Sequence, residues 1–273
     1  MMRFDSGHFA IILGASSGFG LATAQKLAAH GMNLVLVHRD RRGSMDRITP
    51  CFDQIRQTGV KVFAFNADAL SDEGRTRVLD EVKNAMGKSG RIRTMLHSIA
   101  FGNLKPLAPA GPGGQEGGET GTILRREDFD HTIYAMATSL ADWTRDTFER
   151  GMFADDARVL GLTSQGSTLA WRGYAAVSAA KAALEALVRA IAFEYAPYGI
   201  RANIIQAGIC PTPALAAIPG HKEMLHGAAL KNPLGRLTRP EDVANTVFLL
   251  STDEAAWING AFLHADGGEH IAG

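Results

Sequence analysis

A tyrosine and a lysine, Tyr174 and Lys181, stand seven positions apart in YAAVSAAK, at the start of a long apolar helical pattern. Seven residues are nearly two helical turns, or about 10.5 Å of rise, so both side chains share one face of a helix without being immediate neighbours. A phenol hydroxyl can stabilise negative charge that develops on a substrate oxygen. From the spacing alone, the two residues fit either a catalytic pair or two unrelated members of a core helix.

Three glycines in ILGASSGFGLATAQKLA could bring the backbone close to a phosphate group. They lie between an apolar run and a helical pattern, where missing side chains allow a sharp turn and the helix N-terminus faces an anion. A plain tight turn is the alternative, and the position at the first strand-to-helix junction of the chain favours the nucleotide. The predicted binding residues of this turn are Gly14, Ser16, Ser17, Gly18, Phe19 and Gly20.

The end of the second predicted strand, VHRDRRG, bears on the choice of cofactor. An acidic residue there would accept hydrogen bonds from the ribose hydroxyls of NAD and repel a 2′-phosphate. Arg39 stands there instead, followed by Arg41 and Arg42, and a guanidinium suits a phosphate in charge and geometry. We predict NADPH, with NADH as the alternative because Asp40 lies in the same loop. A solvated basic loop is the structural alternative.

Short β-rich runs alternate with helical patterns along the chain. Runs that are apolar on both faces and separated by helices predict a parallel sheet covered on both sides, so we expect a doubly wound α/β (Rossmann) fold in one domain over residues 1–273. The expected strands are 8–13, 33–38, 60–67, 91–98, 157–164, 200–208 and 261–264. The expected helices are 21–31, 45–59 with a break near Pro50, 72–87, one within 127–152, 174–197 and 240–251.

One segment, residues 102–122, is dense in glycine and proline. Such a composition cannot bury enough apolar surface to form a packed element, so we expect a surface loop inserted into the single domain. Because it follows the fourth strand, it is expected at the carboxyl edge of the sheet, where ligands bind in such folds. In one interpretation this loop borders the substrate site, and in the other it is a surface insertion with no role in binding.

Composition excludes several classes of partner. The 273 residues are 46% hydrophobic and 21% charged, and 28 basic residues balance 28 acidic ones. Zero net charge gives no general attraction to nucleic acid or to a membrane surface. Cys51 and Cys210 are too few for a disulfide framework and lack metal-ligand spacing, so no metal site is expected. A reducing compartment and an apparently leaderless start, MMRFDSG, predict a cytoplasmic protein.

Motifs spread over nearly the whole chain resemble the short-chain dehydrogenase/reductases. They are GASSGFG, the stretch NADALSD, and RLTRPEDVANTVFLLSTDEAAWINGAFLHADGG near the end. The resemblance implies that Asp68 would hydrogen-bond the adenine amine, while a turn residue is the structural alternative for this position. It also implies that Ile209 and Thr212 of QAGICPT would hold the nicotinamide carboxamide, although Ala207-Gly208 replaces the Pro-Gly usual in the family.

Two marks are similar to a divergent branch, the enoyl-acyl-carrier-protein reductases. The branch has Tyr-x6-Lys, as in Tyr174 and Lys181, where the common branch has Tyr-x3-Lys and this chain has Val177. HSIAFG, residues 97–102, also resembles the branch and adds Ser98 to the expected cofactor contacts. The resemblance gives Lys181 the place that binds the nicotinamide ribose.

Other positions depart from these patterns. Ser164 stands where many of the divergent reductases have a second tyrosine, and Met136 stands where the common branch has an asparagine for proton relay. Ser164 could assist carbonyl chemistry, or it could cap the end of a strand. Met136 is expected in a helix core, and His97 is expected to be a satisfied partner of a backbone group rather than an acid or base.

The function predicted from these residues and from the resemblance is NADPH-dependent reduction of the 2,3 double bond of an enoyl thioester, as in fatty acid synthesis. The resemblance alone implies a homotetramer. The substrate would be an acyl thioester, carried by acyl carrier protein in one version. Tyr174 would stabilise charge on the thioester oxygen, and Lys181 would hold the ribose. The alternatives are a carbonyl reductase or alcohol dehydrogenase that uses Ser164 with Tyr174, and a non-catalytic NADP(H) sensor.

Overall fold

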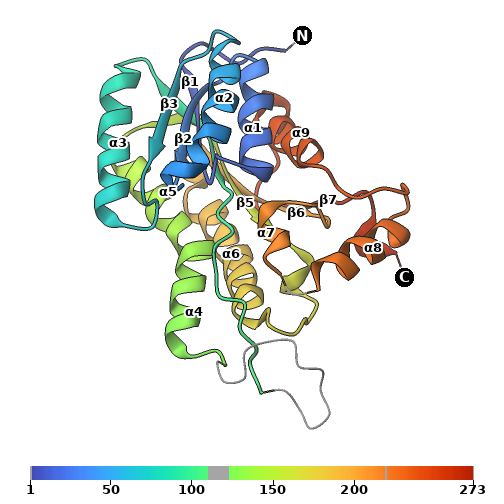
Figure 1. Ribbon diagram of the computed structural model, residues 1–273. Coiled ribbons are helices and arrows are strands. Elements are labelled where there is room, and N and C mark those ends of the chain that lie inside the picture. The colour runs from blue at the N-terminus through green and yellow to red at the C-terminus, as the bar shows by residue number, and fades with distance from the viewer. Residues whose placement is uncertain (1, 110–122, 219, 273) are drawn as a thin grey trace.

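Seven parallel strands form one sheet in the order β3-β2-β1-β4-β5-β6-β7 (Figure 1). The computed structural model describes residues 2–109, 123–218 and 220–272. The strands are β1 His8–Leu13, β2 Asn33–His38, β3 Val62–Asn66, β4 Arg91–His97, β5 Phe153–Thr163, β6 Ile200–Ala207 and β7 Phe262–Ala265. The order reverses between β1 and β4, so the predicted doubly wound sheet in a single domain is confirmed.

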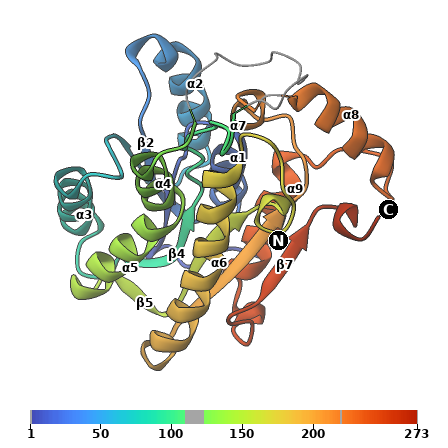
Figure 2. The same cartoon turned by 90° about the horizontal axis from the view of Figure 1, so that it is seen from below.

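Helices cover both faces of the sheet, because alternate residues of each strand point to opposite sides. On one face, Ile11 and Leu13 of β1 pack in a core with α3 (Asp72–Met86), α5 (Ser139–Glu149) and α6 (Ala175–Glu194). On the other, Ala10 and Ile12 pack with α1 (Gly18–Ala29), α2 (Met45–Arg56) and α9 (Pro240–Ser251). Figure 2, seen from below, shows α6 together with α4 (Arg126–Ile133) and α7 (Pro213–Ala216) in front of the strands.

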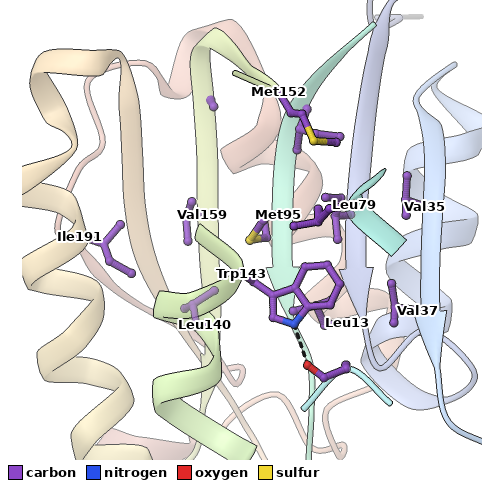
Figure 3. Packing of buried hydrophobic residues seen from close by; sticks show 14 of the residues in the cluster. Leu13, Val35, Val37, Leu79, Met95, Leu140, Trp143, Met152, Val159 and Ile191 are labelled. Carbon is purple, nitrogen blue, oxygen red and sulfur yellow. Dashed lines mark hydrogen bonds between the residues drawn. The ribbon is translucent and has the colours of Figure 1, made fainter. Parts of the chain in front are cut away.

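The larger core centres on Trp143, whose side chain is fully buried (Figure 3). The indole lies among Leu13, Leu140 and Met95, and its Nε1 donates a hydrogen bond to the Ala69 carbonyl oxygen at 2.9 Å. The indole satisfies its one polar atom while burying a large apolar surface. This contact fixes α5 against the segment that follows β3, one of the walls of the site described below.

The expected break at Pro50 does not occur. Helix α2 runs through Pro50 from Met45 to Arg56. A proline there removes one backbone hydrogen bond, but Pro50 is exposed, so water can serve the carbonyl left without a partner. Ile48, Phe52 and Ile55 are buried against the sheet and hold the helix across this point.

Two further differences concern helices. The helix expected within 127–152 is present, but a π-helical turn at Tyr134–Thr138 separates α4 from α5. Between β6 and α9, where no helix was predicted, the chain forms α7 and α8 (His221–Lys231). Both helices follow the carboxyl end of β6, so they stand over the edge of the sheet that carries the predicted site.

The Gly/Pro-rich segment, residues 102–122, is described only in its first part. Residues 102–109 have no helix or strand, as expected, and residues 110–122 lie outside the described residues. The chain on either side is tied together, because Asp128 accepts hydrogen bonds from Asn103 Nδ2, Lys105 Nζ and the Arg125 amide at 2.7, 2.7 and 2.9 Å. In the part of the chain that the structure describes, no helix is long and apolar enough to cross a membrane.

Candidate active site

A cleft of about 690 Å³ opens at the carboxyl ends of the strands, the edge at which ligands bind in doubly wound folds. This volume lies within the usual range for small-molecule and cofactor sites. The cleft brings together residues predicted from segments far apart in the sequence. Its lining includes Gly14, Ser16, Ser17, Gly18, Phe19, Arg39, Asp68, Ser98, Ser164, Tyr174, Lys181, Ile209 and Thr212. Gly20 lies behind this wall.

The glycine turn between β1 and α1 is packed so closely that two of its positions leave no room for a side chain. Gly14 has a φ of +88°, and a Cβ there would stand 2.4 Å from the Ser98 carbonyl oxygen. A Cβ on Gly20 would stand 2.2 Å from the Gly14 carbonyl oxygen, so that position admits only glycine. Ser17, the N-cap of α1, makes no side-chain cap, and the first turn of the helix holds no acidic residue. The turn therefore fits a pyrophosphate.

Arg39 and Asp68, which were assigned separate parts of the nucleotide, contact each other. Arg39 Nη1 donates to Asp68 Oδ2 at 2.9 Å, and the guanidinium lies 5.0 Å from the centre of the Phe101 ring. The side chains are 52% and 41% exposed, so water screens the pair and it contributes about 1 kcal/mol or less. A phosphate can compete for this arginine. Arg41 and Arg42, exposed on the same loop, do not line the cleft.

Tyr174 is the N-cap residue of α6, and its ring is held on two sides. It lies edge-on to Trp171, with ring centres 5.4 Å apart. A Cβ on Gly166 would come within 2.3 Å of the tyrosine ring, so the absence of a side chain there makes room for it. Burial raises the pKa of Tyr174, and a hydrogen bond with the Ser164 side chain opposes that rise. The phenol is therefore protonated at neutral pH and can donate a hydrogen bond.

Lys181 is buried two turns further along α6, and its Nζ donates to the Leu162 carbonyl oxygen at 2.8 Å. Burial lowers the pKa of Lys181 to about 8, and the charge of Glu185 acts in the opposite sense. Glu185 is held in turn by Thr163 Oγ1, which donates to its Oε1 at 2.6 Å. An ammonium has three donors, so Lys181 can bind hydroxyl groups in addition to this carbonyl.

Ser164 has both of the properties considered from the sequence. Its hydroxyl accepts a hydrogen bond from the Gly166 amide at 3.3 Å, which caps the short helix Gln165–Ser167 at the end of β5. The Ser164 side chain also forms the hydrogen bond that lowers the pKa of Tyr174, and Ser164 lines the cleft. Met136, from the π-helical turn, is buried beside Tyr174 and also lines the cleft. The wall thus has a thioether where common-branch members have an amide.

His97 is buried near Lys181 and differs from the expected satisfied backbone partner. Its Nε2 lies 3.0 Å from the Ser139 hydroxyl oxygen, so its partner is a side chain, and its buried Nδ1 has no hydrogen-bond partner among the described residues. Burial, together with the charge of Lys181, lowers the pKa of His97 to about 3. The imidazole is therefore neutral across the physiological range.

Two polar groups of the loop after β6 already have hydrogen-bond partners within the chain. The Ile209 amide already donates a hydrogen bond, at 3.0 Å, to the side chain of Glu269 near the end of the chain. Thr212 Oγ1 accepts from the Leu215 amide at 3.2 Å and caps α7. Sequence reasoning missed Glu269, although its position just after the last strand places it at the same edge of the sheet.

The cleft also has an apolar part that was not predicted. Trp171 and Leu104 contribute to it, and the segment around α7 adds Leu215 and Ile218. Leu104 and Trp171 pack against the cluster that contains Tyr174 and Met136. The tyrosine hydroxyl thus faces a cavity whose walls suit an apolar substrate.

A doubly wound sheet with a glycine turn, a buried tyrosine and a buried lysine at its carboxyl edge is typical of the short-chain dehydrogenase/reductases, the class of oxidoreductases indicated by the sequence. The family model described as enoyl-(acyl carrier protein) reductase matches residues 14–270, so the chain belongs to this family. The resemblance inferred from the sequence is confirmed.

Three similar proteins illustrate the range of the family. The chain is 27% identical over 270 residues to 1-cyclohexenylcarbonyl-CoA reductase of Streptomyces collinus, covering 98% of this chain and 88% of that protein. It is 28% identical over 259 residues to cis-4-hydroxycyclohexanecarboxylate dehydrogenase of Sinomonas cyclohexanicum, covering 95% of each. The solved structure of the Bacillus cereus enoyl-acyl carrier protein reductase with NADP+ and an indole naphthyridinone superimposes with a TM-score of 0.83, at 26% identity and 100% coverage of both chains.

Proposed function

We propose that this oxidoreductase reduces the 2,3 double bond of an enoyl thioester with NADPH. The observation that carries the proposal is the position of Tyr174, a protonated phenol in the apolar wall of the cleft and on the same helix as the buried Lys181. Met136 adds an apolar surface beside the tyrosine. Such a wall accommodates an acyl chain, and the phenol meets the polar end of that chain.

When bound, a nicotinamide would supply a hydride to the β-carbon of the thioester, and a proton would be taken up at the α-carbon. Tyr174 donates a hydrogen bond to the thioester oxygen, where negative charge develops, and this is the interaction of greatest value in such a step. Lys181 holds the nicotinamide ribose and, being cationic below a pKa of about 8, favours delivery of a proton. The apolar lining excludes water from the reacting carbon.

The preference for NADPH rests on Arg39. Its exposed guanidinium stands at the end of β2, where it contacts the Phe101 ring and forms a screened ion pair with Asp68, so a 2′-phosphate can bind it. The Bacillus cereus relative was solved with NADP+, which supports the same choice.

Carbonyl reduction or alcohol oxidation is the second candidate. The contact between Ser164 and Tyr174 favours it, because a serine hydroxyl beside a phenol can polarise a ketone. The relative from Sinomonas cyclohexanicum is named as a dehydrogenase of a hydroxy acid, and it is about as similar to this chain as the CoA thioester reductase.

The same proposal includes a homotetramer acting on a thioester of coenzyme A or acyl carrier protein. Exposed aromatic side chains support self-association, since Trp257 is 97% and Phe193 is 84% exposed. Family members that assemble in this way would cover such residues.

One experiment separates the two reactions. The protein is incubated with NADPH deuterated at its transferable position, together with either a 2-enoyl thioester or a ketone. We expect label at the β-carbon of a saturated thioester, detected by mass spectrometry and NMR of the product. Label found only on an alcohol-bearing carbon would refute the enoyl assignment and leave the carbonyl reductase.

A further inference from the structure

Glu269 is a buried carboxylate in the wall of the cleft. It begins the short helix Glu269–Ile271 after the last strand, and its residue surface is 1% exposed. Its Oε2 accepts the hydrogen bond from the Ile209 amide at 3.0 Å and stands 2.8 Å from the position that a Cβ on Gly208 would occupy. The carboxylate is therefore fixed against the loop that follows β6.

The surroundings of this group do little to neutralise it. Burial raises the pKa of Glu269, and the Ile209 amide opposes that rise. Asp266, from the turn that precedes it, raises the pKa further, while Lys231 at the end of α8 lowers it. The nearby Cys210 thiol stays neutral, because burial raises its pKa to about 12. A buried carboxylate without a close ion pair is costly, and such groups cluster at functional sites.

We infer that Glu269 makes the cleft bind the oxidised nicotinamide cofactor more tightly than the reduced one. The inference rests on the proposed function and on the place beside Ile209 that the family resemblance gives to the nicotinamide carboxamide. An oxidised nicotinamide ring carries a positive charge and a reduced ring carries none, whereas the rest of the nucleotide is the same. A carboxylate in a water-poor wall therefore stabilises only the oxidised form.

The carboxylate also changes the part that Ile209 can play. Its amide hydrogen is already donated to Glu269, so in this arrangement the Ile209 carbonyl, and not its amide, is the backbone group available to a carboxamide. Glu269 lines the cleft, and its carboxylate has a second acceptor oxygen besides the one that binds the Ile209 amide. Glu269 thus acts as a positioning residue for the loop as well as a charge.

The test compares dissociation constants for NADP+ and NADPH, measured by fluorescence titration, in the unmodified protein and in Glu269→Gln. The amide oxygen of glutamine can still accept the Ile209 hydrogen bond, so this change removes the charge and keeps the contact. We expect NADP+ to bind roughly tenfold more weakly, equivalent to about 1.4 kcal/mol, with little change for NADPH. Glu254→Gln removes the same charge at an exposed position on Asp253–Ala255, and both constants should stay unchanged.

A second measurement uses the unmodified protein, so the inference does not depend on the folding of a variant. A cation favours the ionised carboxylate, so NADP+ should bind more tightly as pH rises through the pKa of Glu269, relative to NADPH. At a pH below the pKa of about 8 of Lys181, which also faces the proposed nicotinamide site, calorimetry in buffers of different ionisation enthalpy should show more proton release on binding NADP+ than on binding NADPH. NADP+ and NADPH carry the same phosphate groups. Protonation of these groups therefore affects both dissociation constants equally and does not change their ratio.

The outcomes separate this inference from the proposed function. If both nucleotides bind and their ratio changes neither in Glu269→Gln nor with pH, the role of Glu269 is refuted and the enoyl reductase proposal stands. If no nicotinamide nucleotide binds, both are refuted. A loss of affinity for both forms in Glu269→Gln, with their ratio unchanged, would reduce Glu269 to a structural support.

Discussion

Tyr174 and Lys181 share a helix but differ in what each should contribute, and kinetics can separate them. Tyr174→Phe removes a donor that matters chiefly when charge develops on the substrate oxygen, so we expect turnover to fall by about 10²–10³ with little change in cofactor KM. Lys181→Ala should weaken cofactor binding and turnover together, because the ammonium holds the ribose in both states. Steady-state kinetics with NADPH and thermal unfolding check both results.

Tyr198→Phe is the control for this pair, since Tyr198 is 59% exposed and does not line the cleft. It should retain full activity. If Tyr174→Phe and Lys181→Ala lose activity only in proportion to their folded fraction, the two residues are members of a core helix and not a catalytic pair.

Arg39 gives a second prediction at the scale of single residues. Arg39→Ala should raise the KM for NADPH roughly ten- to hundredfold, because a charge-assisted hydrogen bond is worth about 1.5–3 kcal/mol. The KM for NADH should change little. Arg42→Ala is the matched control, because Arg42 is exposed on the same loop but does not line the cleft. Equal losses with NADPH and NADH would exclude Arg39 from binding the 2′-phosphate.

At the scale of elements, the turn after β5 sets the position of the catalytic candidate on α6. Gly166→Ala would place a methyl group 2.3 Å from the Tyr174 ring and displace it. We expect turnover to fall well below that of the unmodified protein, with cofactor affinity preserved because the glycine turn after β1 is untouched. Gly227→Ala on α8 has open space around the new methyl group and is the control. Unaltered turnover in Gly166→Ala would show that the ring position is not critical.

Much of the fold was predictable because it depends on local patterns. The alternation of apolar runs and helices gave the sheet, and the carboxyl ends of its strands gave the edge where the site would form. Pro50 and the π-helical turn could not be judged from local patterns, since buried contacts of neighbouring residues decide both. Nor could the burial of Glu269 be read from the sequence, because it depends on a loop some 60 positions earlier in the chain.

At the scale of the whole molecule, hydrogen bonds join the segment before residue 107 to the segment after residue 123. Asp128 binds groups from both sides, and the Leu124 amide donates to the Pro106 carbonyl oxygen at 2.9 Å. The entropy of closing a loop grows only with the logarithm of its length, so once its ends are joined its length has little effect on stability. The number of residues between these two ties can therefore change while the sheet stays intact, so a peptide tag can be inserted there at little cost in stability.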